Sequence, residues 1–175
     1  TSIKAGLADV VLAGGVEVMS QAAFAVDGKT RLGNKMGYLK LKDTLLSDGL
    51  TDVFNNYHMG ITAENVAKKY GLTREMQDKF SYKSQVRAIE AVDSGRFKDE
   101  IVPIEIKGKK RTVVFDTDEY PNRTTNLEKL SKLRPAFKSD GTVTAGNASG
   151  INDGATIVLV ASEKAVKEQG LTPIV

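Results

Sequence analysis

The residues best suited to hold a ligand lie in one stretch, Gly141 to Gly154, which reads GTVTAGNASGINDG. Nearly all of its side chains are small, polar or absent. Glycine permits backbone angles that other residues avoid, and small side chains let a backbone approach a ligand closely. Exposed amides and hydroxyls, such as that of Ser149, can then hold the ligand by hydrogen bonds. The same composition is typical of an ordinary loop, so the stretch alone leaves both alternatives open.

The residue types that are missing limit the chemistry of the chain. There is no cysteine, which excludes disulfides, cysteine-ligated zinc and a cysteine nucleophile within these 175 residues. The single histidine, His58, cannot form a multi-histidine metal site. We therefore predict no metal site.

The charge balance is mildly basic, with a formal net charge of +3. Such an excess suits a phosphate-bearing ligand, although it usually reflects a solvated surface. Because the basic residues are scattered without interleaved aromatic side chains, we expect no nucleic-acid binding. No apolar run approaches the ~20 residues of a membrane span, and no signal-peptide pattern is present. These features predict a cytoplasmic protein without a membrane partner.

The elements that must position the stretch fall into two groups. Short apolar runs at residues 9–13 and 155–161 are typical of strands buried in an α/β sheet, and we expect them to be parallel. A helix is predicted after the second run, with Ser162 as its cap and Gly170 at its end. The chain ends, residues 1–20 and 151–175, are thus predicted to carry a sheet with flanking helices.

Residues 21–150 read as a mixed insertion of helices and a hairpin. Helices are predicted over 40–46, 60–71 (capped by Thr62), 73–95 and 126–133, and a hairpin over 101–115. An apolar stripe that includes Met76 and Phe80 predicts core packing for the second long helix. Residues 28–42, basic and interrupted by glycine, indicate either an arm that meets another subunit or a plain surface insertion.

Six motifs in a fixed order support a family resemblance. They are Val11–Ser20, Asp48–Asp52, His58–Ala67, Gly95–Pro103, Leu133–Phe137 and Gly141–Gly154. Together they resemble the thiolases, most closely the biosynthetic type. The resemblance implies an α/β, thiolase-like fold, in which residues 1–20 and 151–175 are parts of the N-terminal α/β half. Residues 21–150 would then be an inserted α+β loop domain.

The resemblance implies condensation of two acetyl-CoA molecules to acetoacetyl-CoA, or the reverse thiolysis. The family uses a nucleophilic cysteine, a second cysteine as base, a histidine from a Gly-His-Pro motif and an asparagine from an Asn-Glu-Ala-Phe motif. None of these motifs occurs here. We therefore expect an internal part of a thiolase, without catalytic residues and inactive alone. A degradative 3-ketoacyl-CoA thiolase and a non-catalytic module for coenzyme A or a nucleotide remain alternatives.

The resemblance also implies that the chain carries the coenzyme A site, with coenzyme A thioesters as substrates and no further cofactor. The matching positions are Ser149, Ala145, Gly150, Ala136 and Phe137 along the pantetheine arm and Leu50, His58 and Met59 near the acyl end. His58 favours the acetyl-specific type. Arg123 matches a phosphate contact one position out of register, and Lys129 stands where relatives often have serine. Residues 28–42 resemble the arm that joins two dimers, so we expect a homo-oligomer.

Overall fold

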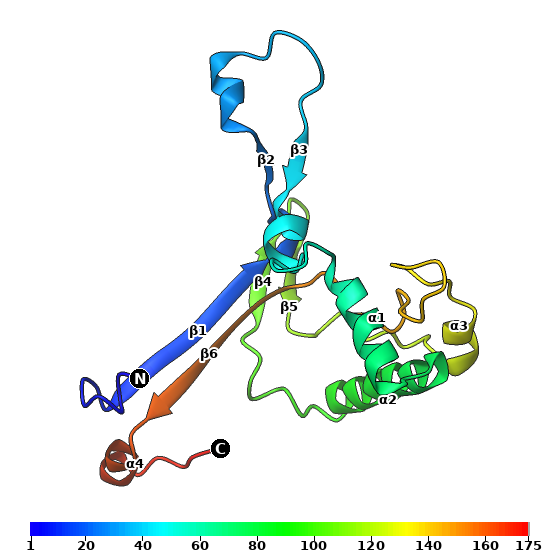
Figure 1. Cartoon of the computed structure of the whole chain (residues 1–175). Coiled ribbons are helices and arrows are strands. Elements are labelled where there is room, and N and C mark those ends of the chain that lie inside the picture. Colours follow the sequence, from blue (N-terminus) through cyan, green and yellow to red (C-terminus); the bar gives the residue numbers. More distant parts are fainter. Residues whose placement is uncertain (175) are drawn as a thin grey trace. The chain divides into compact units, whose positions relative to one another are not determined.

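The computed structural model describes residues 1–174, which divide into two units. The first unit comprises Thr1–Gly49 and Ile151–Val175, and the second comprises Leu50–Gly150. Figure 1 shows the elements of both units coloured along the chain.

The first unit is built on a long ribbon of two strands (Figure 1). Strand β1 (Val10–Val18) pairs with β6 (Asp153–Ala161) in an antiparallel register that runs from Val10↔Ala161 to Val18↔Asp153. The expectation of parallel strands is therefore wrong. A continuous apolar run indicates burial on both faces of a sheet, and it does not report strand direction.

At each end of the ribbon, side-chain hydrogen bonds connect the two chain segments that flank the strands. At one end Ser20 donates from its backbone N and its Oγ to the carboxylate of Asp153, at 2.9 and 2.6 Å. At the other end Ser162 Oγ donates to the carboxylate of Asp9 at 2.9 Å. Gly14 permits the close pairing, because a Cβ there would lie 2.6 Å from the carbonyl oxygen of Thr156.

The apolar side chains of the ribbon are exposed within this chain. On one face Leu12 is 71% and Ile157 is 73% exposed. On the opposite face Val158 is 54% exposed, because successive residues of a strand point to opposite faces. Two strands with apolar residues on both faces cannot bury those residues against each other, so the ribbon needs further layers.

The remaining elements of the first unit are short. Strands β2 (Phe24–Val26) and β3 (Leu41–Asp43) pair antiparallel, and a 3-10 helix covers Gly28–Leu32. The helix predicted over residues 40–46 is wrong in its bounds, because β3 occupies Leu41–Asp43 and a π-helix begins only at Leu45 and runs to Gly49. Helix α4 (Glu163–Gln169) is capped by Ser162 and ends at Gly170, as predicted.

The second unit contains three helices and a hairpin. They are α1 (Met59–Tyr70), α2 (Arg74–Asp93), α3 (Leu127–Ser131), β4 (Ile104–Lys107) and β5 (Thr112–Phe115). The predicted hairpin is confirmed, with β4 and β5 antiparallel. Thr73 and Asn126 cap α2 and α3 through hydrogen bonds to Met76 N and Lys129 N.

Two predictions for the helices are wrong. Thr62 does not cap α1: His58 Nδ1 accepts from Gly60 N at 2.9 Å, because the Thr51↔His58 bridge starts the helix earlier. The apolar stripe of α2 is not core either, since Met76 and Phe80 are exposed. The buried residue of α2 is Asp78, 4% exposed, whose carboxylate accepts hydrogen bonds from the side chains of Arg74 and Asn147.

Candidate functional site

A single carboxylate holds the start of the Gly141–Gly150 stretch against α1. Glu64 Oε1 accepts hydrogen bonds from the backbone N atoms of Thr142 and Val143, both at 2.8 Å. Glu64 Oε2 accepts from Thr142 Oγ1 at 3.1 Å. Without these bonds, two backbone donors of a half-buried loop would lose their acceptor, so Glu64 orders the stretch locally.

The stretch also rests on α2 and α3. Gln77 Nε2 donates to Thr142 Oγ1 at 2.9 Å, and Ser81 Oγ donates to the carbonyl oxygen of Gly146 at 2.6 Å. A Cβ on Gly146 would lie 2.5 Å from the side chain of Leu130 in α3. Glycine is therefore required here for close packing against a helix.

The three residues that the resemblance placed at the acyl end, Leu50, His58 and Met59, gather around the start of α1 together with Phe137. Met59 N donates to Leu50 O at 2.8 Å. The rings of His58 and Phe137 stack at a centroid distance of 4.8 Å and an interplanar angle of 23°. His58 Nδ1 already accepts from Gly60 N, so the neutral ring carries its proton on Nε2 and can donate from there.

Residues 135–137 link this cluster to the stretch. Ala136 N donates to Val143 O at 2.9 Å, and Pro135 and Thr144 form an isolated β-bridge. The ring of Phe137 fills the space beside Gly60, where a Cβ would overlap it. The acyl-end residues and the Gly141–Gly150 stretch thus belong to one packed assembly.

The far end of the stretch exposes the residues that were matched to the pantetheine arm. Ala145 and Ser149 are exposed, and among residues 1–174 the Ser149 hydroxyl makes no hydrogen bond. The ring of Tyr120 occupies the space beside Gly150, where a Cβ would overlap its hydroxyl. Tyr120 is a neighbour that sequence reasoning missed, since nothing in its local pattern pairs it with Gly150.

Arg123 is engaged in an ion pair. Its Nη1 and Nη2 donate to the two carboxylate oxygens of Asp93 at 2.9 and 2.6 Å. Asp93 raises the pKa of Arg123, and the bond from Arg123 lowers the pKa of Asp93 below its usual value. Both side chains are exposed, so the pair is accessible to solvent. Lys129 Nζ donates to Thr124 O at 2.8 Å.

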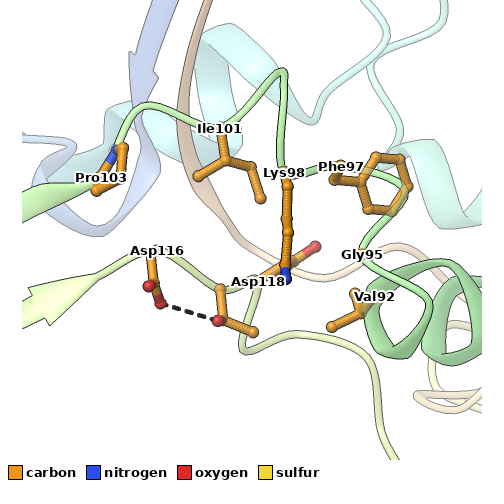
Figure 2. Close-up of a pocket in the computed structure, with 9 residues that line it drawn as sticks. Val92, Gly95, Phe97, Lys98, Ile101, Pro103, Asp116 and Asp118 are labelled. Carbon is orange, nitrogen blue, oxygen red and sulfur yellow. Dashed lines mark hydrogen bonds between the residues drawn. The ribbon is translucent and has the colours of Figure 1, made fainter.

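A separate hollow of about 350 Å³ lies at the end of α2 (Figure 2). Its lining combines apolar side chains with Lys98, Asp116 and Asp118. It includes residues of the Gly95–Pro103 motif but none of the predicted coenzyme A site residues. Thr117 Oγ1 donates to Asp116 at 3.0 Å and Tyr120 N donates to Asp118 at 2.9 Å. The carboxylates of Asp116 and Asp118 thus already accept hydrogen bonds from their own loop.

Residues 1–174 lack two kinds of feature. None of the helices in that range has the length and apolarity needed to cross a bilayer. The same range contains no group of three or more histidine, cysteine, aspartate or glutamate side chains arranged to hold a metal ion.

The family is shown by comparison with known proteins. A model described as the thiolase N-terminal domain matches residues 1–164. The chain belongs to the thiolase family.

Curated thiolase relatives cover nearly all of this chain. An acetyl-CoA acetyltransferase of Allochromatium vinosum is 55% identical over 174 residues, which are 99% of this chain and 44% of that protein. One from Syntrophomonas wolfei is also 55% identical, over 98% of this chain and 43% of that protein. The chain therefore spans less than half the length of these thiolases.

Solved thiolase structures share the fold. The acetyl-CoA acetyltransferase of Syntrophomonas wolfei has a TM-score of 0.89 at 46% identity, covering 98% of this chain and 43% of that one. Human mitochondrial 3-ketoacyl-CoA thiolase also reaches 0.89, at 48% identity and the same coverage. The expected α/β, thiolase-like fold is confirmed.

Proposed function

We propose that the protein containing this chain is a cytoplasmic acetyl-CoA C-acetyltransferase, which joins two acetyl-CoA molecules into acetoacetyl-CoA and free coenzyme A, or runs the reverse thiolysis. This chain supplies part of the coenzyme A site. The proposal is carried by the packed assembly of Leu50, His58, Met59 and Phe137 with the Gly141–Gly150 stretch in a member of the thiolase family.

The exposed residues of the stretch suit a pantetheine arm. Such an arm is narrow and carries two amides, so it needs a smooth wall with a few hydrogen-bonding groups. Ala145 and Gly150 present little bulk, and the free hydroxyl of Ser149 can donate to or accept from an amide. At the other end, His58 Nε2 can donate to a carbonyl oxygen of the bound thioester.

The chemical steps need groups from outside this chain. Transfer of an acetyl group through a thioester requires a thiolate nucleophile, and these 175 residues contain no cysteine. The chain alone is therefore proposed to be inactive, and its part in the reaction is to bind and orient the substrate. Arg123 is a weaker candidate for the phosphates of coenzyme A, because Asp93 neutralises its charge.

The experiment is thiolysis of acetoacetyl-CoA by the full protein that contains this chain, with residues 1–175 alone as the comparison. The full protein is expected to consume acetoacetyl-CoA and free coenzyme A and to release two acetyl-CoA molecules, while the chain alone gives no turnover. A full protein that binds coenzyme A without turnover would favour the non-catalytic module. Turnover by the chain alone would contradict the assignment of the chemistry to other residues.

A 3-ketoacyl-CoA thiolase is the second candidate, favoured by the 48% identity to the human mitochondrial enzyme of that name. The two candidates differ in acyl chain length. Comparing thiolysis of acetoacetyl-CoA with that of a long-chain 3-ketoacyl-CoA separates them. We expect the short substrate to be preferred, because His58 and Phe137 fill the space at the start of α1.

A contact with other subunits is proposed for the arm, residues 28–42, which begins after β2 and ends within β3. Large apolar side chains are almost fully solvated there: Met36 is 92% and Tyr38 is 100% exposed. Basic residues accompany them at Lys29, Arg31, Lys35, Lys40 and Lys42. An exposed apolar tip of this kind is typical of a surface that is buried on association, which supports a homo-oligomer, a dimer of dimers.

A further inference from the structure

The side chain of Asn147 makes three hydrogen bonds inside the second unit. Its Oδ1 accepts from Thr144 N at 2.7 Å. Its Nδ2 donates to Asp78 Oδ1 at 2.9 Å and to Thr142 O at 3.2 Å. One amide group thus bonds to the backbone of Thr142 and Thr144, at the entry to a turn, and to Asp78 of helix α2.

The turn closed by Asn147 is tightly fixed. Asn147 N donates to Thr144 O at 3.2 Å, and Gly146 N donates to Thr144 Oγ1 at 3.2 Å. Thr144 itself is fully buried, at 0% exposed. Ala145 is the exposed residue at the apex of the turn, and Ser149 follows two residues after Asn147.

The hydrogen-bond partners around Asn147 fit an asparagine side chain but not an aspartate or an alanine. Two acceptors face Nδ2 and one donor faces Oδ1, which defines the orientation of the amide. An aspartate would place an oxygen against the carboxylate of Asp78 and the carbonyl of Thr142. An alanine would leave Thr144 N, which lies in the buried turn, without this acceptor.

Asp78 is itself held in place, so it fixes Asn147. Arg74 Nε donates to Asp78 Oδ2 at 2.8 Å, and Arg74 Nη2 donates to the carbonyl oxygens of Leu130 and Leu133 at 2.5 and 3.0 Å. The chain of bonds therefore runs from α3 through Arg74 and Asp78 to Asn147. A charge this deeply buried stays favourable only with such partners.

We propose that Asn147 is a positioning residue, which together with Asp78 sets the turn that presents Ala145 and Ser149 to coenzyme A. Asn147 touches no substrate in this assignment and acts through the shape of the stretch. The inference rests on the proposed function of the stretch as part of the coenzyme A site.

The test uses the full protein that contains this chain, with the substitution Asn147→Asp and Asn65→Asp as the matched control. Asn65 is an exposed residue of α1, so the control adds the same charge without entering the network. We expect amide hydrogen exchange over residues 142–150 to accelerate about tenfold or more in N147D, with unchanged exchange in α1. N65D is expected to behave as the wild type. Unchanged exchange over 142–150 in N147D overturns the positioning role.

Binding of coenzyme A, measured by titration calorimetry, tests the second half of the inference. N147D is expected to bind coenzyme A about tenfold more weakly than the wild type. In the double variant with S149A, N147D is expected to add little to the loss caused by S149A alone, because both changes remove the contact between Ser149 and coenzyme A. Independent, additive losses would show that Asn147 does not act through Ser149. If N147D does not fold, the uncharged variant N147A is measured in the same way.

Failure of the proposed function and failure of the positioning role of Asn147 give different results. A wild-type protein that binds no coenzyme A refutes the proposed function. The exchange measurement needs no ligand, and it still decides whether Asn147 sets the turn. Binding by the wild type with an undiminished affinity in both N147D and N147A overturns the inference and leaves the proposed function intact.

Discussion

Glu64 is the residue on which the order of the Gly141–Gly150 stretch depends most directly. Its pKa reflects opposing causes: desolvation raises the pKa, while the bonds from Val143 N, Thr142 N and Thr142 Oγ1, together with the charge of Lys138, lower it. The net direction is a lowered pKa, which means that the ionised form is the one the folded protein binds best. A carboxylate that receives several backbone N–H bonds therefore stabilises the fold more while it is charged than after it is protonated.

We predict that Glu64→Gln destabilises the full protein by about 1–2 kcal/mol at neutral pH, because it replaces a charged acceptor of several bonds by a neutral one. Since the folded pKa is lowered, the contribution is present above the unfolded pKa of a glutamate and is lost as the pH falls through the folded pKa. Urea unfolding at neutral and acidic pH measures this, with the exposed Glu75→Gln as the control. An equal loss for E64Q at both pH values would contradict the role of its charge.

At the scale of elements, the helices show why the local sequence predicts some helix caps correctly and others wrongly. Ser162 caps the helix that follows it, as predicted. Thr73 and Asn126, which were predicted only as the first residues of their helices, cap α2 and α3. The start of α1 depends instead on the bridge between Thr51 and His58, which joins residues seven positions apart and overrides the Thr62 signal. Local chemistry predicts a cap well only where no longer-range contact competes with it.

The arm is predicted to mediate the contact between subunits. Replacing Met36 and Tyr38 by aspartate in the full protein is expected to halve the assembled mass, because two charges would enter an apolar contact between subunits. Light scattering after size-exclusion chromatography measures the mass. The exposed Phe54 lies outside the arm, and Phe54→Asp is the control that should leave the assembly unchanged. A double variant with the wild-type mass would show that the arm is only a surface insertion.

At the scale of the whole molecule, the β1–β6 ribbon determines whether residues 1–175 can stay folded and dispersed without the rest of a thiolase. Most apolar side chains of the two strands are exposed, on both faces, and within residues 1–174 neither strand pairs with a further strand along its outer edge. Such surfaces pair with other strands or aggregate. The matched thiolases are more than twice as long as this chain, so they have sequence available to cover the ribbon.

We therefore predict that residues 1–175, expressed alone, aggregate at micromolar concentration, whereas the full protein stays dispersed. Dynamic light scattering and a thermal melt followed by circular dichroism measure the difference. A cooperative melt of a monodisperse 175-residue monomer would show that the ribbon does not need further layers.

The sequence by itself determined the family, most of the helices, the β4–β5 hairpin and the exposed small residues of the stretch, because these depend on local periodicity, caps and ordered motifs. Only the tertiary structure decided the antiparallel register of β1 and β6, since an apolar run carries no information on strand direction. It alone also revealed the loop partners of Glu64 and the bond between Asn147 and Asp78. Those bonds join residues about 70 to 80 positions apart, and no local pattern encodes such a pairing.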